Sequence, residues 1–255
     1  MHQKKLVGVA ILSLACFFVL VFSLLSHKVL YSTLVQVDSS VEQIVAPLRA
    51  SKDLAQFMLS MTYLGNPEII IVFEICLLAL IVLLHRKRIA RLFLGSIIAG
   101  ELASLFFKNI LARTRPAETV FHISRVGYSF PSGHALLGTL FYGSLGFFLV
   151  HILHKKWQRV AVAISTTCII FLIGFSRIYL GVHYATDVIG GWLLGSTFLV
   201  LVGIFFVKIH HHLKSESLKS LSRTERVGLI VVSFMLGFFL LFFVITHTEE
   251  LRSIL

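Results

Sequence analysis

Residues 186–207 have the sequence TDVIGGWLLGSTFLVLVGIFFV, in which Asp187 is the only charged residue. A helix of about 20 apolar residues is long enough to cross the roughly 30 Å hydrocarbon core of a bilayer. Similar apolar runs recur along the chain, so we predict an all-α protein, a polytopic membrane helical bundle forming a single domain over residues 1–255. The predicted spans are 6–26, 68–84, 90–111, 133–153, 158–176, 186–207 and 227–246.

The composition supports a chain whose main solvent is lipid. Of its 255 residues, 57% are hydrophobic and 14% are charged, whereas a soluble domain carries about 25% charged residues. The formal net charge of +11 would favour nucleic-acid binding in a soluble protein, but here the basic residues lie mainly in short loops beside apolar runs. We therefore predict no nucleic-acid partner and interpret the charge as a topology signal.

The first apolar run, Leu6–Leu25, follows a basic N-terminus and has two interpretations. A cleaved signal peptide has a shorter apolar core and a small-residue cleavage site, so a retained span is favoured. Most Lys and Arg residues lie at the N-terminus and in the loops after the second, fourth and sixth spans. By the positive-inside rule these segments are cytoplasmic, which places the C-terminus, after seven spans, outside.

The longest outer connection is the segment 27–67. Apolar residues recur at helical spacing over 41–48 and over 54–61, and Pro47 and the polar residues 51–53 separate the two patterns. One interpretation is interfacial helices that rest on the lipid surface, and the other is a rim that guides substrate into a site. On the opposite side, we expect the basic loop 208–226 to contact anionic headgroups; a metal role for its histidine tract is the less favoured alternative.

Two cations mark the outer end of the third span. Lys108 and Arg115 are seven residues apart, about two helical turns, so both can face the same way. Pro116 follows and disfavours helical geometry at Arg115. We therefore expect the helix to end there, with both cations at its outer mouth.

The next group is Pro131-Ser132-Gly133-His134, directly before the fourth span. Ser132 is a candidate N-cap, and Gly133 lets a backbone N–H approach a ligand without obstruction by a side chain. A helix N-terminus suits an anion, and His134 falls in or near the first helical turn.

The third group, Ser176-Arg177 with His183 and Asp187, bridges the outer ends of the fifth and sixth spans. His183 and Asp187 are four residues apart and would be neighbours on a helix. A carboxylate beside a histidine fixes its tautomer and makes the other ring nitrogen a better nucleophile. Arg177 adds a planar donor fork suited to phosphate.

Together these groups predict phosphoryl transfer at the outer membrane boundary. Three cations and a helix N-terminus can neutralise a phosphoryl group, and such transfer depends mainly on positioning and electrostatics. His183 would attack phosphorus to give a phosphohistidine, and His134 would protonate the leaving oxygen and later activate water. No metal and no cofactor are predicted, because Lys108, Arg115 and Arg177 supply the charge.

The three groups resemble a known family signature, that of the type 2 phosphatidic acid phosphatase superfamily, or lipid phosphate phosphatases. The resemblance covers about 101–195, the expected catalytic core. It also implies six spans, so the predicted seventh span is an addition to the family pattern. The matching motifs are Lys108-(six residues)-Arg115-Pro116, Pro131-Ser132-Gly133-His134 and Ser176-Arg177-(five residues)-His183-(three residues)-Asp187.

The resemblance implies a metal-independent phosphatase acting on a lipid phosphate, and we expect it in the inner membrane of a bacterial cell. His183 would be the nucleophile, Asp187 its partner and His134 the general acid. Phosphatidic acid, phosphatidylglycerophosphate, polyprenyl diphosphate and lipid A-type phosphates all stay open as substrates. The residues implied to bind phosphate are Lys108, Arg115, Ser132, Gly133 and Arg177.

Further polar residues lie near these groups. Glu101 precedes Lys108 by seven residues, and we predict that it helps to position Lys108; a protonated carboxyl bonded to a neighbouring helix is the alternative. Ser176 is a second candidate for a supporting role. Arg113 and the polar residues of 118–125 are interpreted as solvated or supporting.

Other functions also stay open. A membrane transporter or channel would place its site near the midplane, on broken helices, whereas these charges cluster at one boundary. A catalytically silent lipid-binding relative would not need a complete set of nucleophile, acid and phosphate ligands. Soluble haloperoxidases share a similar signature around vanadate, but the membrane character of the chain argues against that chemistry.

Overall fold

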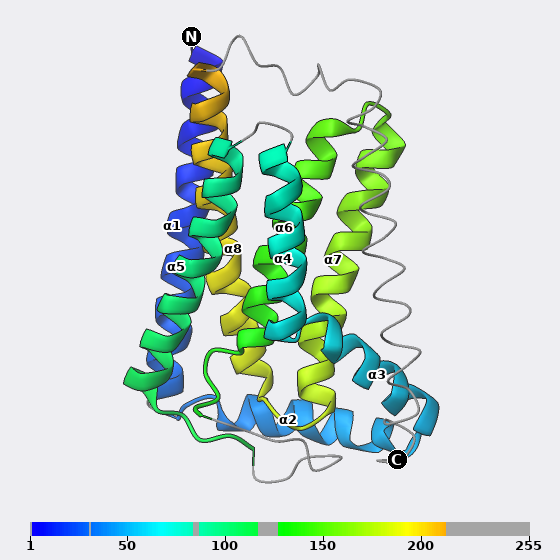
Figure 1. Cartoon of the computed structure of the whole chain (residues 1–255). Coiled ribbons are helices and arrows are strands. Elements are labelled where there is room, and N and C mark those ends of the chain that lie inside the picture. The colour runs from blue at the N-terminus through cyan, green and yellow to red at the C-terminus, as the bar shows by residue number, and fades with distance from the viewer. Residues whose placement is uncertain (1, 31, 84–86, 117–126, 213–255) are drawn as a thin grey trace.

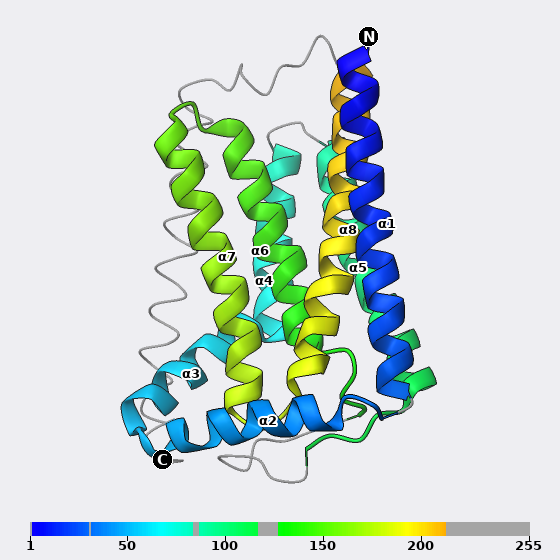
Figure 2. The same cartoon turned by 180° about the vertical axis from the view of Figure 1, so that it is seen from behind.

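The computed structural model of the chain describes residues 2–30, 32–83, 87–116 and 127–212. Every regular element in these ranges is a helix, so the predicted all-α class is correct. Long helices stand side by side as a bundle, and shorter ones cross one of its ends (Figures 1 and 2). The long helices are α1 (His2–Leu30), α4 (Pro67–Leu83), α5 (Lys87–Leu111), α6 (Gly133–Ile152), α7 (Lys156–Tyr179) and α8 (Ala185–His212).

These helices match the first six predicted spans. Five of them are long and apolar enough to cross a membrane, and α4 gives a sixth span when it is joined to α3 (Lys52–Leu64), from which it is bent by 48°. Two helices are longer than predicted. The span predicted to end at 176 continues to Tyr179 as α7, and the span predicted to end at 207 continues to His212 as α8. The predicted seventh span and most of the basic loop before it lie outside the described residues.

The core of the bundle surrounds α6, which packs against α5, α7 and α8. Phe130 and Leu136 are completely buried there. Large apolar side chains also cover the outside of the bundle, since Leu20, Ile75 and Leu102 are 58%, 62% and 61% exposed. An apolar surface of this extent is unfavourable in water and is what contact with lipid tails requires. The chain is a multi-pass membrane protein.

One glycine sets how closely α8 approaches α6. A Cβ atom added at Gly191 would lie 2.5 Å from the carbonyl oxygen of Ser132 and 2.9 Å from the Cβ of Ala135. This approach lets the backbone N–H of Ser132 donate to the carbonyl oxygen of Asp187 at 2.9 Å. The hydrogen bond joins the start of α6 to the start of α8, two segments that both carry predicted site residues.

The connection 27–67 folds into helices at the two places where amphipathic patterns were predicted. They are α2 (Val35–Val45), followed by the 3-10 helix η1 (Ala46–Ala50), and α3. Ser51 caps α3 by accepting a hydrogen bond from a backbone N–H in its first turn. Figures 1 and 2 show α2 lying across the end of the bundle where α7 and α8 meet.

This segment is docked on the protein rather than only resting on lipid. Arg49 of η1 donates to the carbonyl oxygen of Tyr179 at 2.7 Å, and the hydroxyl of Tyr179 donates to the carbonyl oxygen of Leu48 at 3.1 Å. These hydrogen bonds fix the α2–η1 unit to the end of α7.

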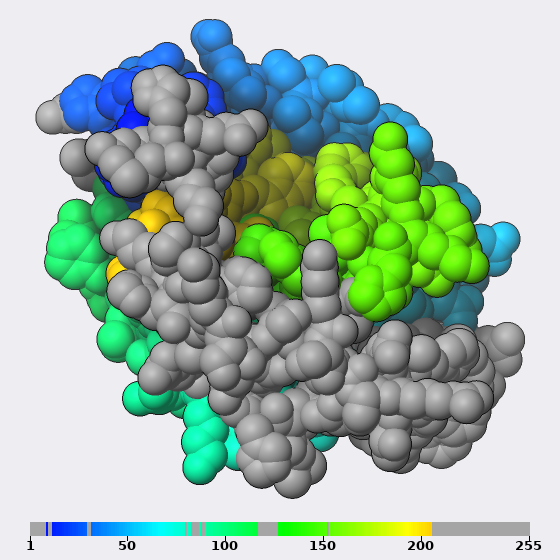
Figure 3. All heavy atoms as spheres, turned by 90° about the horizontal axis from the view of Figure 1, so that it is seen from above, coloured from blue at the N-terminus to red at the C-terminus, as the bar shows by residue number. Residues whose placement is uncertain are grey.

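The other end of the bundle carries the segments whose charges predicted the cytoplasmic side. The N-terminus of α1, the start of α5, the α6–α7 connection and the end of α8 all lie opposite α2 (Figure 1). Figure 3, a view onto that end, shows the α6–α7 connection at its surface. The basic segments and α2 thus lie at opposite ends.

Candidate active site

The predicted site residues come from the ends of four helices that meet beside α2. Lys108 is near the end of α5, residues 132–134 begin α6, Arg177 is near the end of α7, and Asp187 is in the first turn of α8. All four helix ends lie at the end of the bundle that α2 crosses (Figure 1). The structure therefore brings the three sequence groups together, as predicted.

The end of α5 differs from the prediction. The helix ends at Leu111, and Ala112 takes a left-handed conformation with φ of 42°, so Arg115 lies in a non-helical segment and shares no helix face with Lys108. The two cations meet instead at one carbonyl oxygen. Lys108 Nζ donates to the carbonyl oxygen of Tyr128 at 3.0 Å, and Arg115 Nη2 donates to the same oxygen at 3.4 Å.

The start of α6 presents a hydroxyl and a histidine. Ser132 occupies the N-cap position, as predicted, but its hydroxyl does not cap the helix: Oγ is buried and has no hydrogen-bond partner among the described residues. A Cβ added at Gly133 would meet nothing within 4 Å, so the backbone there borders open space. His134 packs against the α3–α4 turn, where a Cβ at Gly65 would lie 3.3 Å from its ring. A buried hydroxyl without a partner is available to bind a phosphoryl oxygen.

The spacing had suggested that His183 and Asp187 are neighbours on one helix. In the structure, His183 lies instead in the loop between α7 and α8. Its Nδ1 is 3.4 Å from Asp187 Oδ2, and its Nε2 is 3.1 Å from Nη1 of Arg115. Because a guanidinium can only donate, Nε2 accepts this hydrogen bond and the ring proton is on Nδ1, facing Asp187. The lone pair of Nε2 therefore faces the cations, where a phosphoryl group would bind.

The surroundings of His183 keep its ring neutral. Burial, together with Arg177, Arg115 and Lys108, holds the pKa of His183 well below its usual range. Neutral imidazole is the form that can attack phosphorus. The cations that suit a phosphate thus also keep the predicted nucleophile unprotonated.

Arg177 is held by a residue that the sequence analysis did not identify. Its Nη1 donates to Oγ1 of Thr62 in α3 at 2.6 Å, and both side chains are buried. Its Nε has no hydrogen-bond partner among the described residues. One branch of the guanidinium is therefore fixed, while Nε is available to an anion.

Residues 89–210 match the family model of the PAP2 superfamily. This part of the chain is therefore similar to the PAP2 superfamily, and the relatives and solved structures that resemble it are membrane PAP2 phosphatases. It is 36% identical over 110 residues to phosphatidylglycerophosphatase B of Bacillus subtilis, covering 43% of this chain and 54% of that relative. It is 35% identical over 109 residues to undecaprenyl-diphosphatase of Sulfolobus acidocaldarius, covering 41% of this chain and 47% of that relative. The chain spans about half the length of the curated relatives it matches.

A solved PAP2 structure extends the likeness to more of the chain. The crystal structure of a transmembrane PAP2 type phosphatidylglycerolphosphate phosphatase from Bacillus subtilis superimposes with a TM-score of 0.69 at 27% sequence identity. The match covers 76% of this chain and 96% of that one. The described bundle is thus the membrane fold of a PAP2 protein, including helices that precede residue 89.

Asp187 has a partner besides the predicted histidine. Its Oδ1 accepts a hydrogen bond from Nη1 of Arg113 at 2.5 Å, and Nη2 of Arg113 donates to Oδ2 of Asp38 in α2 at 2.6 Å. The side chain of Arg113 is only 14% exposed and is paired with two buried carboxylates, so its interpretation as a solvated residue was wrong, and its supporting role stays a prediction.

Asp38 was also missed, although the sequence holds a signal for it. Asp38 and Val45 are the buried residues of α2, and Asp38 lies one helical turn before the apolar pattern that starts at Val41. A lone carboxylate on the apolar face of an amphipathic helix is unfavourable unless it is paired. Extending the pattern backwards would have predicted such a pairing.

The two predicted supporting residues make other contacts. Ser176 donates to the carbonyl oxygen of Ile173 in its own helix at 2.7 Å and is completely buried. Oε1 of Glu101 is buried without a hydrogen-bond partner among the described residues, whereas Lys108 donates to the carbonyl oxygen of Tyr128. No hydrogen bond joins Glu101 to Lys108 in the described part of the chain, so direct positioning of Lys108 by this carboxylate is not observed.

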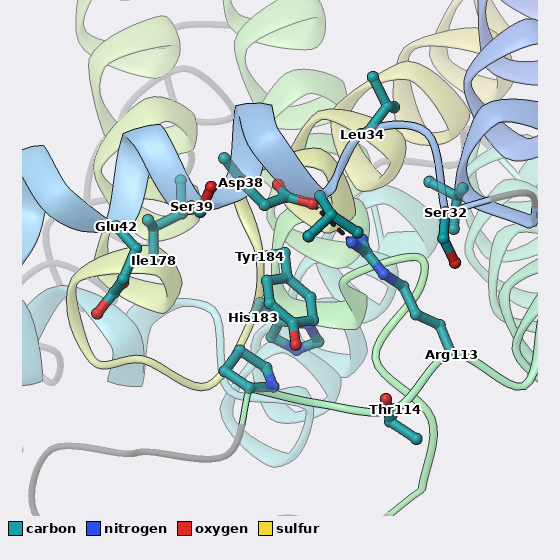
Figure 4. A pocket seen from close by; sticks show the side chains of 14 residues that line it. Ser32, Leu34, Asp38, Ser39, Glu42, Arg113, Thr114, Ile178, His183 and Tyr184 are labelled. Atoms are coloured by element: carbon teal, nitrogen blue, oxygen red, sulfur yellow. Dashed lines mark hydrogen bonds and ion pairs between the residues drawn. The ribbon is translucent and has the colours of Figure 1, made fainter.

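A pocket of about 440 Å³ lies beneath α2, against His183 (Figure 4). Its wall combines Arg113 and Tyr184 with apolar side chains from the end of α1 and from the α1–α2 turn, among them Val29 and Leu34. A cavity of this size can hold part of a small ligand. Among the described residues, no three His, Cys, Asp or Glu side chains are grouped so that they could hold a metal ion, and the site's positive charge comes from its side-chain cations.

Proposed function

We propose that this chain is a membrane lipid phosphate phosphatase that hydrolyses a phosphomonoester or diphosphate of a lipid through a phosphohistidine intermediate. The single observation that carries the proposal is the geometry of His183, whose Nδ1 faces Asp187 and whose Nε2 accepts a hydrogen bond from Arg115. A neutral histidine with its lone pair directed at a cluster of cations is arranged to attack a bound phosphoryl group.

In the first step, a phosphoryl group binds between Lys108, Arg115 and Arg177, with the hydroxyl of Ser132 as a further donor. Nε2 of His183 attacks phosphorus, the P–N bond forms, and the bond from phosphorus to the lipid oxygen breaks. His134 then supplies the proton that the leaving oxygen needs, because its place at the start of α6 borders the same space.

In the second step, water replaces the lipid oxygen. His134, now without its proton, removes one from the water as the water oxygen attacks phosphorus. The P–N bond breaks, inorganic phosphate leaves, and His183 returns to its neutral form. Asp187 stabilises the positive charge that the ring of His183 carries while it is phosphorylated. The cations stabilise the charge on the phosphoryl oxygens in both steps.

The proposed substrate is a lipid phosphate that approaches from the outer leaflet of a bacterial inner membrane. The basic segments lie at the end of the bundle opposite α2, and the positive-inside rule makes that end cytoplasmic. The pocket beneath α2 opens beside His183 and is partly apolar, which favours the interpretation of 27–67 as a rim for substrate entry. Related proteins are named for phosphatidylglycerophosphate, undecaprenyl diphosphate and lipid A.

The proposal is tested by a phosphate-release panel in detergent with phosphatidic acid, phosphatidylglycerophosphate, undecaprenyl diphosphate and lipid A, without added metal and with chelator. We expect wild type to release phosphate from at least one lipid and His183→Ala to release none. Rapid acid-free quenching of wild type with labelled substrate should trap label on His183. Phosphate release that persists in His183→Ala, or that needs added Mg²⁺, would contradict the mechanism, and a wild-type chain active on no lipid would contradict the function.

A further inference from the structure

Both carboxylate oxygens of Asp187 are occupied, and they have different partners. Oδ2 accepts from the backbone N–H of Tyr184 at 2.9 Å and faces Nδ1 of His183 at 3.4 Å. Oδ1 accepts from Arg113 at 2.5 Å. The guanidinium therefore makes the closest contact to Asp187, so the direction in which Asp187 points toward His183 depends on where Arg113 is held.

Arg113 is held from α2. Its second branch donates to Oδ2 of Asp38 at 2.6 Å, an ion pair drawn as a dashed line in Figure 4. The guanidinium also lies over the ring of Tyr184, 4.2 Å from the ring centre. An arginine fork fixed at both branches and on one face has little freedom to turn.

Asp38 is in turn fixed by the residue next to Asp187. The backbone N–H of Thr186 donates to Asp38 Oδ1 at 3.0 Å, and its hydroxyl donates to Asp38 Oδ2 at 2.8 Å. Asp38, Thr186 and Asp187 are all buried. These hydrogen bonds connect three segments to one another: α2 through Asp38, the segment after α5 through Arg113, and the start of α8 through Thr186 and Asp187.

We propose that Asp38 and Arg113 are positioning residues for the phosphatase reaction, and we call Asp38, Arg113 and Asp187 the α2 bridge. Arg113 holds Asp187 so that the ring of His183 presents Nε2 to the phosphoryl group, and Asp38 holds Arg113. The inference rests on the proposed phosphatase function and adds that α2, a helix outside residues 89–210, is needed for the rate of the chemical step.

The physical reason is that one guanidinium is shared between two buried carboxylates. If Asp38 loses its charge, the second branch of Arg113 loses its ion pair, while the first branch keeps Asp187 and the hydroxyl of Thr186 as partners. The guanidinium is then held more weakly from α2, so it turns and Asp187 moves with it. A displacement of about 1 Å in a reacting group can lower a rate by about 100-fold. The effect falls on the chemical step, because none of the three residues is among the proposed phosphate ligands.

The chain offers a matched control for the docking of α2. Arg49 forms an ion pair with Glu42 of α2 and donates to the carbonyl oxygens of Tyr179 and Ile178. This anchor attaches the same α2–η1 unit to the same end of the bundle but touches neither Asp187 nor His183. Arg49→Gln therefore weakens docking without altering the α2 bridge.

The experiment compares the purified full-length variants Asp38→Asn, Arg113→Gln and Arg49→Gln with wild type, on the panel lipid that wild type hydrolyses fastest. For Asp38→Asn and Arg113→Gln we expect kcat to fall about tenfold or more with KM changed less than about twofold, the signature of lost transition-state stabilisation. For Arg49→Gln we expect a lower melting temperature in detergent but kcat within about twofold of wild type.

A double-mutant comparison separates positioning from stability. In an Asp187→Asn background, Asp38→Asn should lower kcat by less than about twofold, because its effect passes through a carboxylate that is already gone. If Asp38→Asn does not fold, Asp38→Glu replaces it: the charge is kept, the carboxylate is displaced by one methylene, and kcat should still fall.

Three results would overturn the α2 bridge while wild type remains active. They are an unchanged kcat in Asp38→Asn, an equal loss of kcat in Arg49→Gln, and a full additional loss when Asp38→Asn is added to Asp187→Asn. A wild-type chain that hydrolyses no panel lipid would instead overturn the proposed function, and this inference with it.

Discussion

Replacing Gly191 with alanine is expected to push α8 away from α6 and to lower phosphatase activity. The added Cβ would lie 2.5 Å from the carbonyl oxygen of Ser132, roughly 1 Å inside ordinary van der Waals contact, and it would also lie 3.1 Å from the backbone nitrogen of Leu136. Backbone atoms cannot rotate away as a flexible side chain can. The two helices must therefore separate at the point where Ser132 donates to the carbonyl oxygen of Asp187.

The magnitude follows from that overlap. Overpacking of this kind costs about 1–3 kcal/mol of stability, and alanine returns up to about 1 kcal/mol through its better helix propensity. A shift of about 1 Å between the helices that carry His134 and Asp187 lowers the rate of the chemical step by about 10- to 100-fold. We therefore expect kcat to fall more than the melting temperature would suggest.

Gly203→Ala in the same helix is the control. A Cβ there would meet only the ring of Phe147, at 4.0 Å, so the change adds helix propensity without overlap. Phosphate release and thermal melting in detergent are measured for Gly191→Ala, Gly203→Ala and wild type. We expect Gly203→Ala to melt no lower than wild type and to keep its kcat. Full activity of Gly191→Ala would refute the argument that this close approach positions the site.

Three further predictions concern single groups. Because the active form of His183 is neutral and burial beside Arg177, Arg115 and Lys108 holds its pKa well below the usual range, the acid limb that this group causes in the kcat/KM profile should lie below the ordinary histidine value of about 6.5; an acid limb at the ordinary value that no variant of another histidine removes would contradict the stated environment. Thr62→Val removes the hydroxyl that fixes Arg177 and should raise KM about tenfold, by about 1.4 kcal/mol, whereas Thr197→Val, which removes only a bond within its own helix, should leave KM unchanged. Ser132→Ala removes a buried hydroxyl that has no partner among the described residues, so the melting temperature should stay the same or rise while KM rises; an unchanged KM would remove Ser132 from the proposed phosphate ligands.

The bundle could be predicted from the sequence because lipid imposes a simple rule on helix length and polarity. Each of the first six predicted spans has a matching helix. The end of α5 could not be predicted in this way, because the left-handed residue Ala112 precedes Pro116 by a full turn and alanine gives no sign of that conformation. The prediction that Lys108 and Arg115 share a helix face was wrong for this reason, although the two side chains still meet.

The candidate site residues that could be predicted are those that lie in short motifs, where reactive residue types follow one another at a recognisable spacing. His134, Arg177 and His183 belong to short motifs, and the folding of four helix ends brings them together. Their supporting contacts come from elsewhere: the hydrogen bonds of Thr186 to Asp38 join residues 148 positions apart. Spacing carries no information about such contacts, since they depend on how α2 docks.

A buried polar side chain on an otherwise apolar helix face can nevertheless indicate docking. Asp38 and Thr62 both lie in 27–67, outside the part of the chain that matches the family model, and both are buried with a site arginine as partner. A helix that only rested on lipid would gain nothing from a carboxylate on its apolar face, because an unpaired charge there is costly. The same cost explains why the partners are arginines of the site: these are the nearby groups that can satisfy a buried acceptor while remaining charged. Contacts that complete the site thus come from a segment whose sequence is typical of a surface helix, and the exchange of this segment alone should change the rate of a PAP2 core that keeps all of its motif residues.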